Sequence, residues 1–261
     1  MSAQVAGDVL EVRDIAVSFA GVRALDEVSF SISGPGVFGL IGSNGAGKTT
    51  LLNVVTAAIR PTSGTVFMRG HSVVGVPTYQ IARLGVARTF QTVRLFGEQS
   101  VLENVAIGTY RNTHAGLLAG MFALPGARAE QRRAHEEALQ ALAFVGLENR
   151  ANDAAELLPF GQQRLLELAR ALALRPWLLL LDEPAAGLND AETERLADLI
   201  LSLPARGLTV LVVEHNMALM MRISQSIVVL NHGEKIAEGS PREIQADRSV
   251  IDAYLGPDVM P

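Results

Sequence analysis

The sequence predicts an α/β fold in which helices cover a buried parallel sheet. Four apolar runs of four to six residues are typical of strands buried on both faces, namely Val37–Ile41, Trp177–Leu181, Leu208–Val213 and Ile227–Leu230. Helical patterns alternate with these runs, and a Gly-rich turn follows the first of them. With 261 residues, 49% of them apolar and 19% charged, the chain can form one or two domains with a well-buried core.

Composition excludes several classes of function. The chain has 22 Lys and Arg against 27 Asp and Glu, a net charge of -5, which argues against binding nucleic acid through a broad basic face. It has no Cys, and therefore no disulfide or thiolate chemistry. Mean hydropathy is +0.26, yet no apolar run approaches the roughly 20 residues that cross a bilayer. The first residues lack the pattern of a signal peptide, so we expect the chain to stay in the cytoplasm.

The N-terminal part is expected to form an antiparallel edge sheet followed by a strand, a loop and a helix. Residues 9–32 consist of two strand-like pieces separated by Ala20 and Gly21, a pattern typical of a hairpin. The strand Val37–Ile41 then leads into a Gly-rich turn and a segment with few helix breakers, Thr50–Ile59. This order of elements matters for the first motif below.

The middle of the chain is predicted to be a helical insertion. Between about Thr92 and Arg175 the pattern is helical, and four apolar residues fall on one helix face: Ala134, Ala138, Leu142 and Val145. The Gly- and Ala-rich stretch His114–Arg128 is the most loop-like interior segment. The α/β core is therefore discontinuous in the sequence.

Strand and helix alternation resumes after the insertion. We expect helices near Ala191–Leu203 and Met217–Ile223, and a closing hairpin over residues 226–239. No internal repeat is evident.

The first motif is a glycine-rich phosphate loop. The segment GSNGAGKTT fits G-x-x-x-x-G-K-[ST] and lies between a predicted strand and a predicted helix. Backbone N–H groups can point at phosphates, the lysine can contact the β and γ oxygens, and the following threonine can supply a hydroxyl to Mg²⁺. Its residues are Gly42, Ser43, Asn44, Gly45, Ala46, Gly47, Lys48, Thr49 and Thr50.

The second motif is an apolar strand that ends in two carboxylates. We expect Asp182 to hold Mg²⁺, and Glu183 to orient and deprotonate the attacking water, because in-line phosphoryl transfer needs a positioned nucleophile. Together the two motifs indicate an ATPase or a GTPase. A GTPase is disfavoured because the chain lacks the N-K-x-D element that reads guanine.

Three weaker features follow in a definite order. Gln91, in ARTFQ, can contact the metal and the attacking water, and His215, in VVEHN, can hydrogen-bond the γ-phosphate and the base. The segment LPFGQQ, at residues 158–163, opens a helix. Each feature alone is a weak indication of function, whereas their order and spacing together are a stronger one.

The chain resembles the ATP-binding subunit of ABC transporters over nearly its whole length. The resemblance rests on the phosphate loop, Gln91, LPFGQ, LLLLDEP, AAGLN and His215, all in family order. Within that superfamily it is similar to branched-chain amino acid importer ATPases of the LivG type, through VARTFQTVRLF, GQQRLLELAR, DEPAAGLN, EHNM and AYLG.

The resemblance implies further site residues. Phe19 matches the position where an aromatic ring stacks on adenine, and the signature segment LPFGQ places Phe160, Gly161 and Gln162 against a nucleotide held by a second subunit. The family signature usually reads LSGGQ, so Pro159 removes a hydroxyl here, although proline suits the first turn of a helix. We therefore expect a weakened contact between subunits.

The resemblance also implies architecture and partners. It predicts a RecA-like P-loop NTPase core over residues 8–91 and 175–244 with a helical subdomain over about 92–174, together an ATPase domain over 8–244, and a C-terminal tail over 245–261. The expected ligands are ATP and Mg²⁺. The expected partners are two transmembrane permease subunits, a second ATPase subunit (an identical copy or a LivF-like one) and an extracytoplasmic solute-binding protein, with the chain peripheral on the inner face of the cell membrane and no nucleic acid. Urea or amide import, lipopolysaccharide export and a soluble non-transport ATPase stay open as alternatives.

Overall fold

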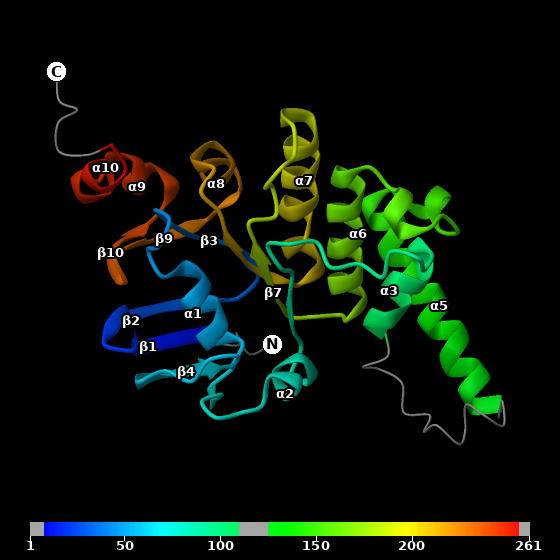
Figure 1. Ribbon diagram of the computed structural model, residues 1–261, viewed down its shortest axis with the longest axis horizontal. Coiled ribbons are helices and arrows are strands. Elements are labelled where there is room, and N and C mark those ends of the chain that lie inside the picture. Colours follow the sequence, from blue (N-terminus) through cyan, green and yellow to red (C-terminus); the bar gives the residue numbers. More distant parts are fainter. Residues whose placement is uncertain (1–7, 110–124, 256–261) are drawn as a thin grey trace, which may run out of the picture.

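A six-stranded sheet forms the centre of the molecule. The computed structural model describes residues 8–109 and 125–255 (Figure 1). The strands lie in the order β10 (Glu234–Gly239), β9 (Ser226–Asn231), β3 (Gly36–Gly42), β8 (Thr209–Val213), β7 (Leu178–Asp182) and β6 (Val86–Arg88). All neighbours are parallel except β9 and β10, which form the expected closing hairpin. The four apolar runs are confirmed as strands.

Side chains of the sheet alternate between two hydrophobic cores. Leu179 and Leu181 of β7 belong to the core that the helices share, whereas Leu178 and Leu180 belong to the core on the opposite face. This period of two is that of an extended strand, and both faces are buried. It explains why these strands are apolar at every position.

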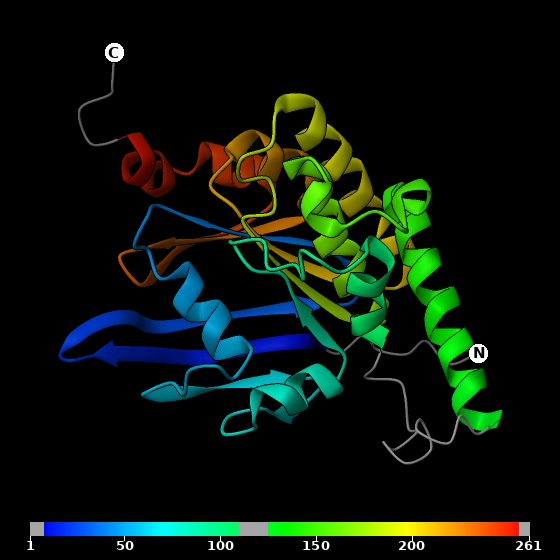
Figure 2. The ribbon, with the colours of Figure 1, turned by 45° about the vertical axis from the view of Figure 1, so that its right-hand side comes forward.

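Most of the helices cover one face of this sheet, in agreement with the expected parallel sheet covered by helices. That face carries α6 (Phe160–Ala173), α7 (Asp190–Ser202), α8 (Met217–Ile223), α9 (Pro241–Ala246) and α10 (Arg248–Leu255). On the opposite face, α1 (Lys48–Val55) packs together with a second sheet (Figure 2). The predicted helices near Ala191–Leu203 and Met217–Ile223 correspond to α7 and α8.

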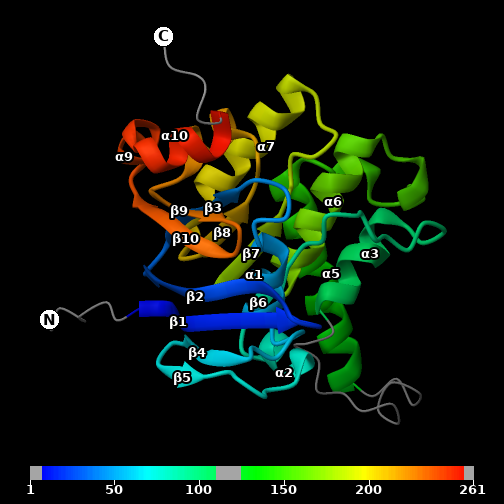
Figure 3. The same ribbon diagram turned by 60° about the vertical axis from the view of Figure 1, so that its left-hand side comes forward.

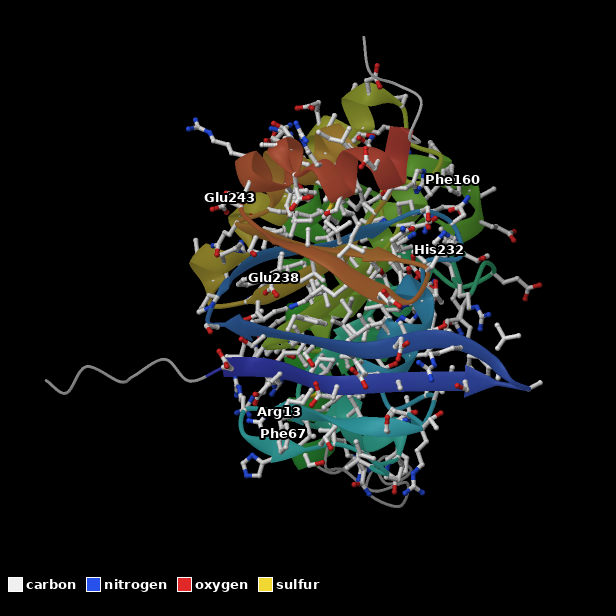
Figure 4. The ribbon with its side chains drawn as sticks, turned by 90° about the vertical axis from the view of Figure 1, so that its left-hand side faces the viewer. Arg13, Phe67, Phe160, His232, Glu238 and Glu243 are labelled. Atoms are coloured by element: carbon white, nitrogen blue, oxygen red, sulfur yellow. The ribbon has the colours of Figure 1, made fainter. Side chains whose placement is uncertain are left out.

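The second sheet has four antiparallel strands. It consists of β2 (Val22–Ser33), β1 (Asp8–Phe19), β4 (Ser63–Met68) and β5 (His71–Ser72), in that order (Figure 3). As predicted, β1 and β2 form a hairpin that turns at Ala20 and Gly21. Both of these residues have positive φ. Across β1 and β4 the guanidinium of Arg13 lies 4.5 Å from the ring centroid of Phe67 (Figure 4).

The helix after the phosphate loop is shorter than expected and starts earlier. It spans Lys48–Val55 instead of Thr50–Ile59. Ala57 has φ 54°, which is left-handed, and the N–H groups of Ala58 and Ile59 both donate to the carbonyl of Asn53. The chain therefore leaves the helix at this turn.

The inserted segment is helical, as predicted. The helices α3 (Val101–Thr109), α5 (Pro125–Val145) and α6 pack on one another. On α5, Ala138, Leu142 and Val145 are buried and Ala134 is half-buried. Residues 114–124 of the loop-like stretch lie outside the described residues, whereas 125–128 open α5, where Pro125 needs no backbone N–H. The limits of the two subdomains and of the C-terminal tail stay a prediction.

Short elements complete the chain. They are α2 (Thr78–Arg83) and the single 3₁₀ turns Glu148–Arg150, Ala155–Leu157 and Pro204–Arg206. Across residues 8–109 and 125–255, no helix combines the length and the apolar character that a membrane span requires.

Candidate active site

The phosphate loop joins β3 to α1 and leaves the start of that helix open. Gly47 precedes α1 with φ 100°, and no side chain caps the first turn. A Cβ at Gly47 would lie 2.7 Å from the carbonyl oxygen of Ala24, so glycine is required for space as well as for conformation. The uncapped N–H groups and the helix dipole together suit an anion such as a phosphate.

Lys48 is the first residue of α1, and its buried side chain turns back onto the phosphate loop. Its Nζ donates to the carbonyl oxygens of Gly42 at 2.7 Å and of Ser43 at 3.0 Å. Burial of the ammonium lowers the pKa of Lys48. Three nearby carboxylates oppose that shift, those of Glu183, Asp182 and Glu214. Backbone carbonyl oxygens thus hold the ammonium in place, and phosphate oxygens can replace them as its hydrogen-bond acceptors.

A cavity of about 270 Å³ lies beside the phosphate loop. Two predicted catalytic residues, Gln91 and Glu183, line it from the loops that follow β6 and β7. Its remaining lining residues are Ala24, Asn44, Gly45, Ala46, Gly47, Lys48, Thr49 and Thr50. The fold therefore brings most of the predicted phosphate-binding residues to one site.

Glu183 is the point where the predicted catalytic side chains meet. Its Oε2 accepts a hydrogen bond from Gln91 Nε2 at 2.8 Å, and its Oε1 lies 3.9 Å from Nδ1 of His215. Its backbone has φ 47°, a left-handed conformation that is uncommon outside glycine. Such strain is typical of functional sites because the surrounding structure must hold it. A carboxylate, an amide and an imidazole can here act on one water molecule.

Asp182 is held by an arginine that the sequence reading missed. Arg88 Nη2 donates to Asp182 Oδ2 at 2.9 Å, and Arg88 Nη1 donates to Asn53 Oδ1 at 2.7 Å. A single arginine at the end of a three-residue strand offers no local signal of this pairing.

Glu214 is a second missed residue. Its buried carboxylate accepts hydrogen bonds from the N–H groups of Ala185 at 2.9 Å, His215 at 3.0 Å and Asn216 at 3.4 Å. It thereby joins the loop after Glu183 to the loop that carries His215. An acid directly after the apolar strand β8 was the available signal.

The signature segment lies apart from the lining of the cavity. Phe160, Gly161 and Gln162 form the first turn of α6 and are absent from the cavity lining. Pro159 precedes this turn in an extended conformation, with φ -53° and ψ 150°, instead of lying in the first turn as expected. Extended backbone at this position starts the helix without disturbing it.

Phe19 also lies outside the cavity lining. It is the last residue of β1, and 47% of it is exposed.

The chemistry of the available donors fits Mg²⁺. Thr49 offers a hydroxyl, Asp182 a carboxylate and Gln91 an amide oxygen, since its Nε2 is the atom that bonds Glu183. Hard divalent cations prefer such oxygen ligands. The set can serve a nucleotide-bound magnesium ion.

Two family models match the chain. Residues 25–186, more than half of the sequence, match the model described as ABC transporter. Residues 234–256 match a model described as branched-chain amino acid ATP-binding cassette transporter.

Curated relatives match almost end to end. The high-affinity branched-chain amino acid transport ATP-binding protein BraF of Pseudomonas aeruginosa is 44% identical over 95% of this chain and 98% of its own length. The corresponding protein LivG of Escherichia coli strain K12 is 42% identical over the same shares.

Solved structures match as well. An ATP-binding cassette of an ABC transporter in its ADP conformation superposes with a TM-score of 0.84 at 30% identity, covering 96% of this chain and 99% of that one. A dimeric cassette in a post-hydrolysis state, bound to ADP and Pi, gives 0.76 at 25% identity, covering 89% and 99%.

Proposed function

The chain belongs to the ABC transporter family, and from this premise we propose that it powers an importer for branched-chain or other hydrophobic amino acids. As a member of that family it is a transporter ATPase that binds ATP. The substrate class is supported by the match of residues 234–256 and by the names of relatives that are 42–44% identical.

The bond between Gln91 and Glu183 at the mouth of the phosphate loop is the observation that carries the proposed mechanism. We assign Lys48 and the loop N–H groups to the β- and γ-phosphates. Glu183 accepts the proton of the attacking water, and Gln91 and His215 orient that water. Mg²⁺, bound by Thr49, Asp182 and Gln91, would neutralise charge on the phosphate oxygens.

A second ATPase subunit, identical or LivF-like, completes the site in this proposal. Phe160, Gly161 and Gln162 lie outside the chain's own cavity, which suits a role toward a partner's nucleotide. The dimeric post-hydrolysis cassette supports the arrangement by analogy. Phe19, half-exposed at the end of β1, is free to stack on adenine.

The proposed membrane partners are two permease subunits together with an extracytoplasmic solute-binding protein. The segment 92–105, which follows Gln91, and the helical insertion would receive a helix of the permease. Exposed apolar side chains support this placement, because Phe96 is 51% and Leu157 is 70% exposed. The chain would then lie on the inner face of the cell membrane.

Uptake in living cells tests the substrate. Source cells that lack other branched-chain amino-acid importers would carry Glu183→Gln, with Glu136→Gln, an exposed change on α5, as the matched control. We expect uptake of labelled leucine to fall while uptake of alanine, urea and a sugar is retained. A fall confined to urea would favour urea or amide import, and unchanged uptake of every solute would contradict amino-acid import.

Light scattering tests the paired arrangement. Glu183→Gln should bind ATP without activating the water, so saturating ATP should convert the variant into dimers. Monomers alone at saturating ATP, with or without the second ATPase chain, would contradict the proposal.

A further inference from the structure

Arg164 bonds three backbone carbonyl groups beside the candidate active site from one buried position on α6. Its Nη2 donates to the carbonyl oxygen of Gln91 at 2.7 Å, and its Nη1 donates to that of Phe90 at 3.3 Å. Nη2 also reaches the carbonyl oxygen of Ala186, in the loop after Glu183, at 3.5 Å. The residue is only 7% exposed. One guanidinium thus bonds the backbone of two loops that carry catalytic side chains.

The same guanidinium touches the signature segment. It lies 5.3 Å from the ring centroid of Phe160, a distance at which a cation is attracted to an aromatic face. The Phe160 ring in turn covers Gly187, where an added Cβ would come within 2.8 Å of it. Phe160, Arg164 and the loop at Gly187 therefore form one packed unit.

A buried carboxylate holds this arginine in place. Glu167 lies 3.7 Å from Arg164 and 3.7 Å from Arg170, and its side chain is 4% exposed. Arg170 donates to the carbonyl oxygen of Arg94 at 2.5 Å. Two arginines that share one buried acid therefore bond the same loop, one at Phe90 and Gln91 and the other at Arg94.

The loop that both arginines bond has no regular secondary structure. Residues 89–96, here the Gln91 loop, form neither helix nor strand. The side chain of Gln91 is exposed, yet it reaches Glu183 at 2.8 Å, so the position of the backbone decides whether that bond forms. A displacement of about 1 Å in such a constellation can cost about 100-fold in rate.

We propose that Arg164 is the positioning residue that sets Gln91 against Glu183 and ties the Gln91 loop to the signature end of α6. A planar fork that bonds two consecutive carbonyl groups fixes the direction of the backbone as well as its distance. A movement of Phe160 against a partner subunit would be passed to Gln91 through the same side chain. The inference rests on the catalytic roles proposed for Gln91 and Glu183.

Steady-state hydrolysis by Arg164→Lys tests the inference. Lysine keeps the charge opposite Glu167 but cannot bond both carbonyl groups as a fork. We expect kcat to fall about tenfold while KM for ATP changes less than about twofold. The matched control is Arg195→Lys, since Arg195 Nη2 also donates to a carbonyl, that of Val145 at 2.9 Å, at the end of α5. That variant should keep the kcat of the unmodified chain.

A double variant separates positioning from a merely structural role. In a Gln91→Ala background, Arg164→Lys should lower kcat by less than about twofold, because the side chain that it positions is gone. Losses that multiply would overturn the inference, and so would a normal kcat for Arg164→Lys alone. If Gln91→Ala itself hydrolyses ATP at the normal rate, the proposed role of Gln91 fails and this inference fails with it.

A second pair of substitutions covers a folding defect. Should Arg164→Lys not fold, Arg164→Met together with Glu167→Gln removes both charges of this pair, while Arg170, which also faces Glu167, keeps its bond to the carbonyl oxygen of Arg94. The comparison with and without Gln91→Ala is then repeated, with the same outcome expected and the same outcome contradicting it.

Discussion

Arg88 and Asp182 form a buried ion pair, with Nη2 and Oδ2 separated by 2.9 Å and side-chain exposures of 10% and 6%. The pair joins the ends of the neighbouring strands β6 and β7. The carboxylate of Asp182 is therefore oriented by the protein itself. One of its oxygens is already in use, which restricts how the carboxylate can approach a cation.

Arg88→Met should be strongly destabilising, because it leaves the buried carboxyl group of Asp182 without its ion-pair partner. We expect the free energy of unfolding to fall by about 3 kcal/mol, measured by urea denaturation. The control is Lys235→Met, which breaks the more exposed pair with Glu238 at 2.7 Å and should cost less than about 1 kcal/mol. Equal losses of unfolding free energy in the two variants would show that the buried pair contributes no more to stability than the exposed one.

Lys48→Met should remove nucleotide binding without weakening the nucleotide-free fold, because it removes a desolvated ammonium. Burial lowers the pKa of Lys48, so between its folded pKa and the ordinary lysine value the unfolded chain binds more protons. Wild-type stability therefore rises with pH across that interval, relative to the variant. Denaturation from about pH 8 to pH 10 checks the slope.

The nucleotide arm of this experiment uses thermal unfolding. ATP should raise the melting temperature of the wild type and leave that of Lys48→Met unchanged. A variant that is clearly less stable without ATP, or a slope of opposite sign, would contradict the argument.

Glu214→Gln should loosen the two loops that the carboxylate joins. The amide of glutamine has one oxygen that can accept a hydrogen bond and one NH₂ group that cannot. One of the N–H groups of Ala185 and His215 therefore loses its acceptor. We expect a loss of about 2 kcal/mol, with faster hydrogen exchange at these amides. Glu103→Gln is the control, because this exposed acid accepts from the N–H of Ser100 and an amide oxygen can still accept that bond, so its effect on stability should be clearly smaller. Unchanged exchange at Ala185 and His215 would rule out the joining role.

Pro159→Ser should stabilise the start of α6 relative to Pro159→Ala, because serine at the N-cap can accept from the first-turn N–H groups. The expected difference is about 1 kcal/mol in unfolding free energy. If the missing hydroxyl also matters between subunits, only the serine variant strengthens ATP-driven dimerisation in light scattering. Greater stability with unchanged dimerisation would identify Pro159 as an accommodated variant.

The central strands and the two hairpins could be predicted because their signals are local. An apolar run of five residues and a turn at Ala20 and Gly21 define themselves within a few positions. The end of α1 was placed too late because Ala57 carries no sequence signal for its left-handed backbone. The antiparallel sheet was predicted from β1 and β2, but its third strand β4 was missed, since nothing local in β4 indicates that it pairs with β1.

The sequence by itself was enough to predict the phosphate loop, Lys48 and the pair Asp182 and Glu183, because each predicted role depends on adjacent residues. Tertiary structure alone decided which distant side chains hold them: Arg88 reaches Asp182 across 94 positions, and Arg164 reaches the Gln91 carbonyl across 73. Strand order brings β6 beside β7, and helix packing brings α6 beside the Gln91 loop. The periodicity of apolar residues and the spacing of motifs reflect local geometry. Buried charged side chains, in contrast, find their partners only when the chain has folded.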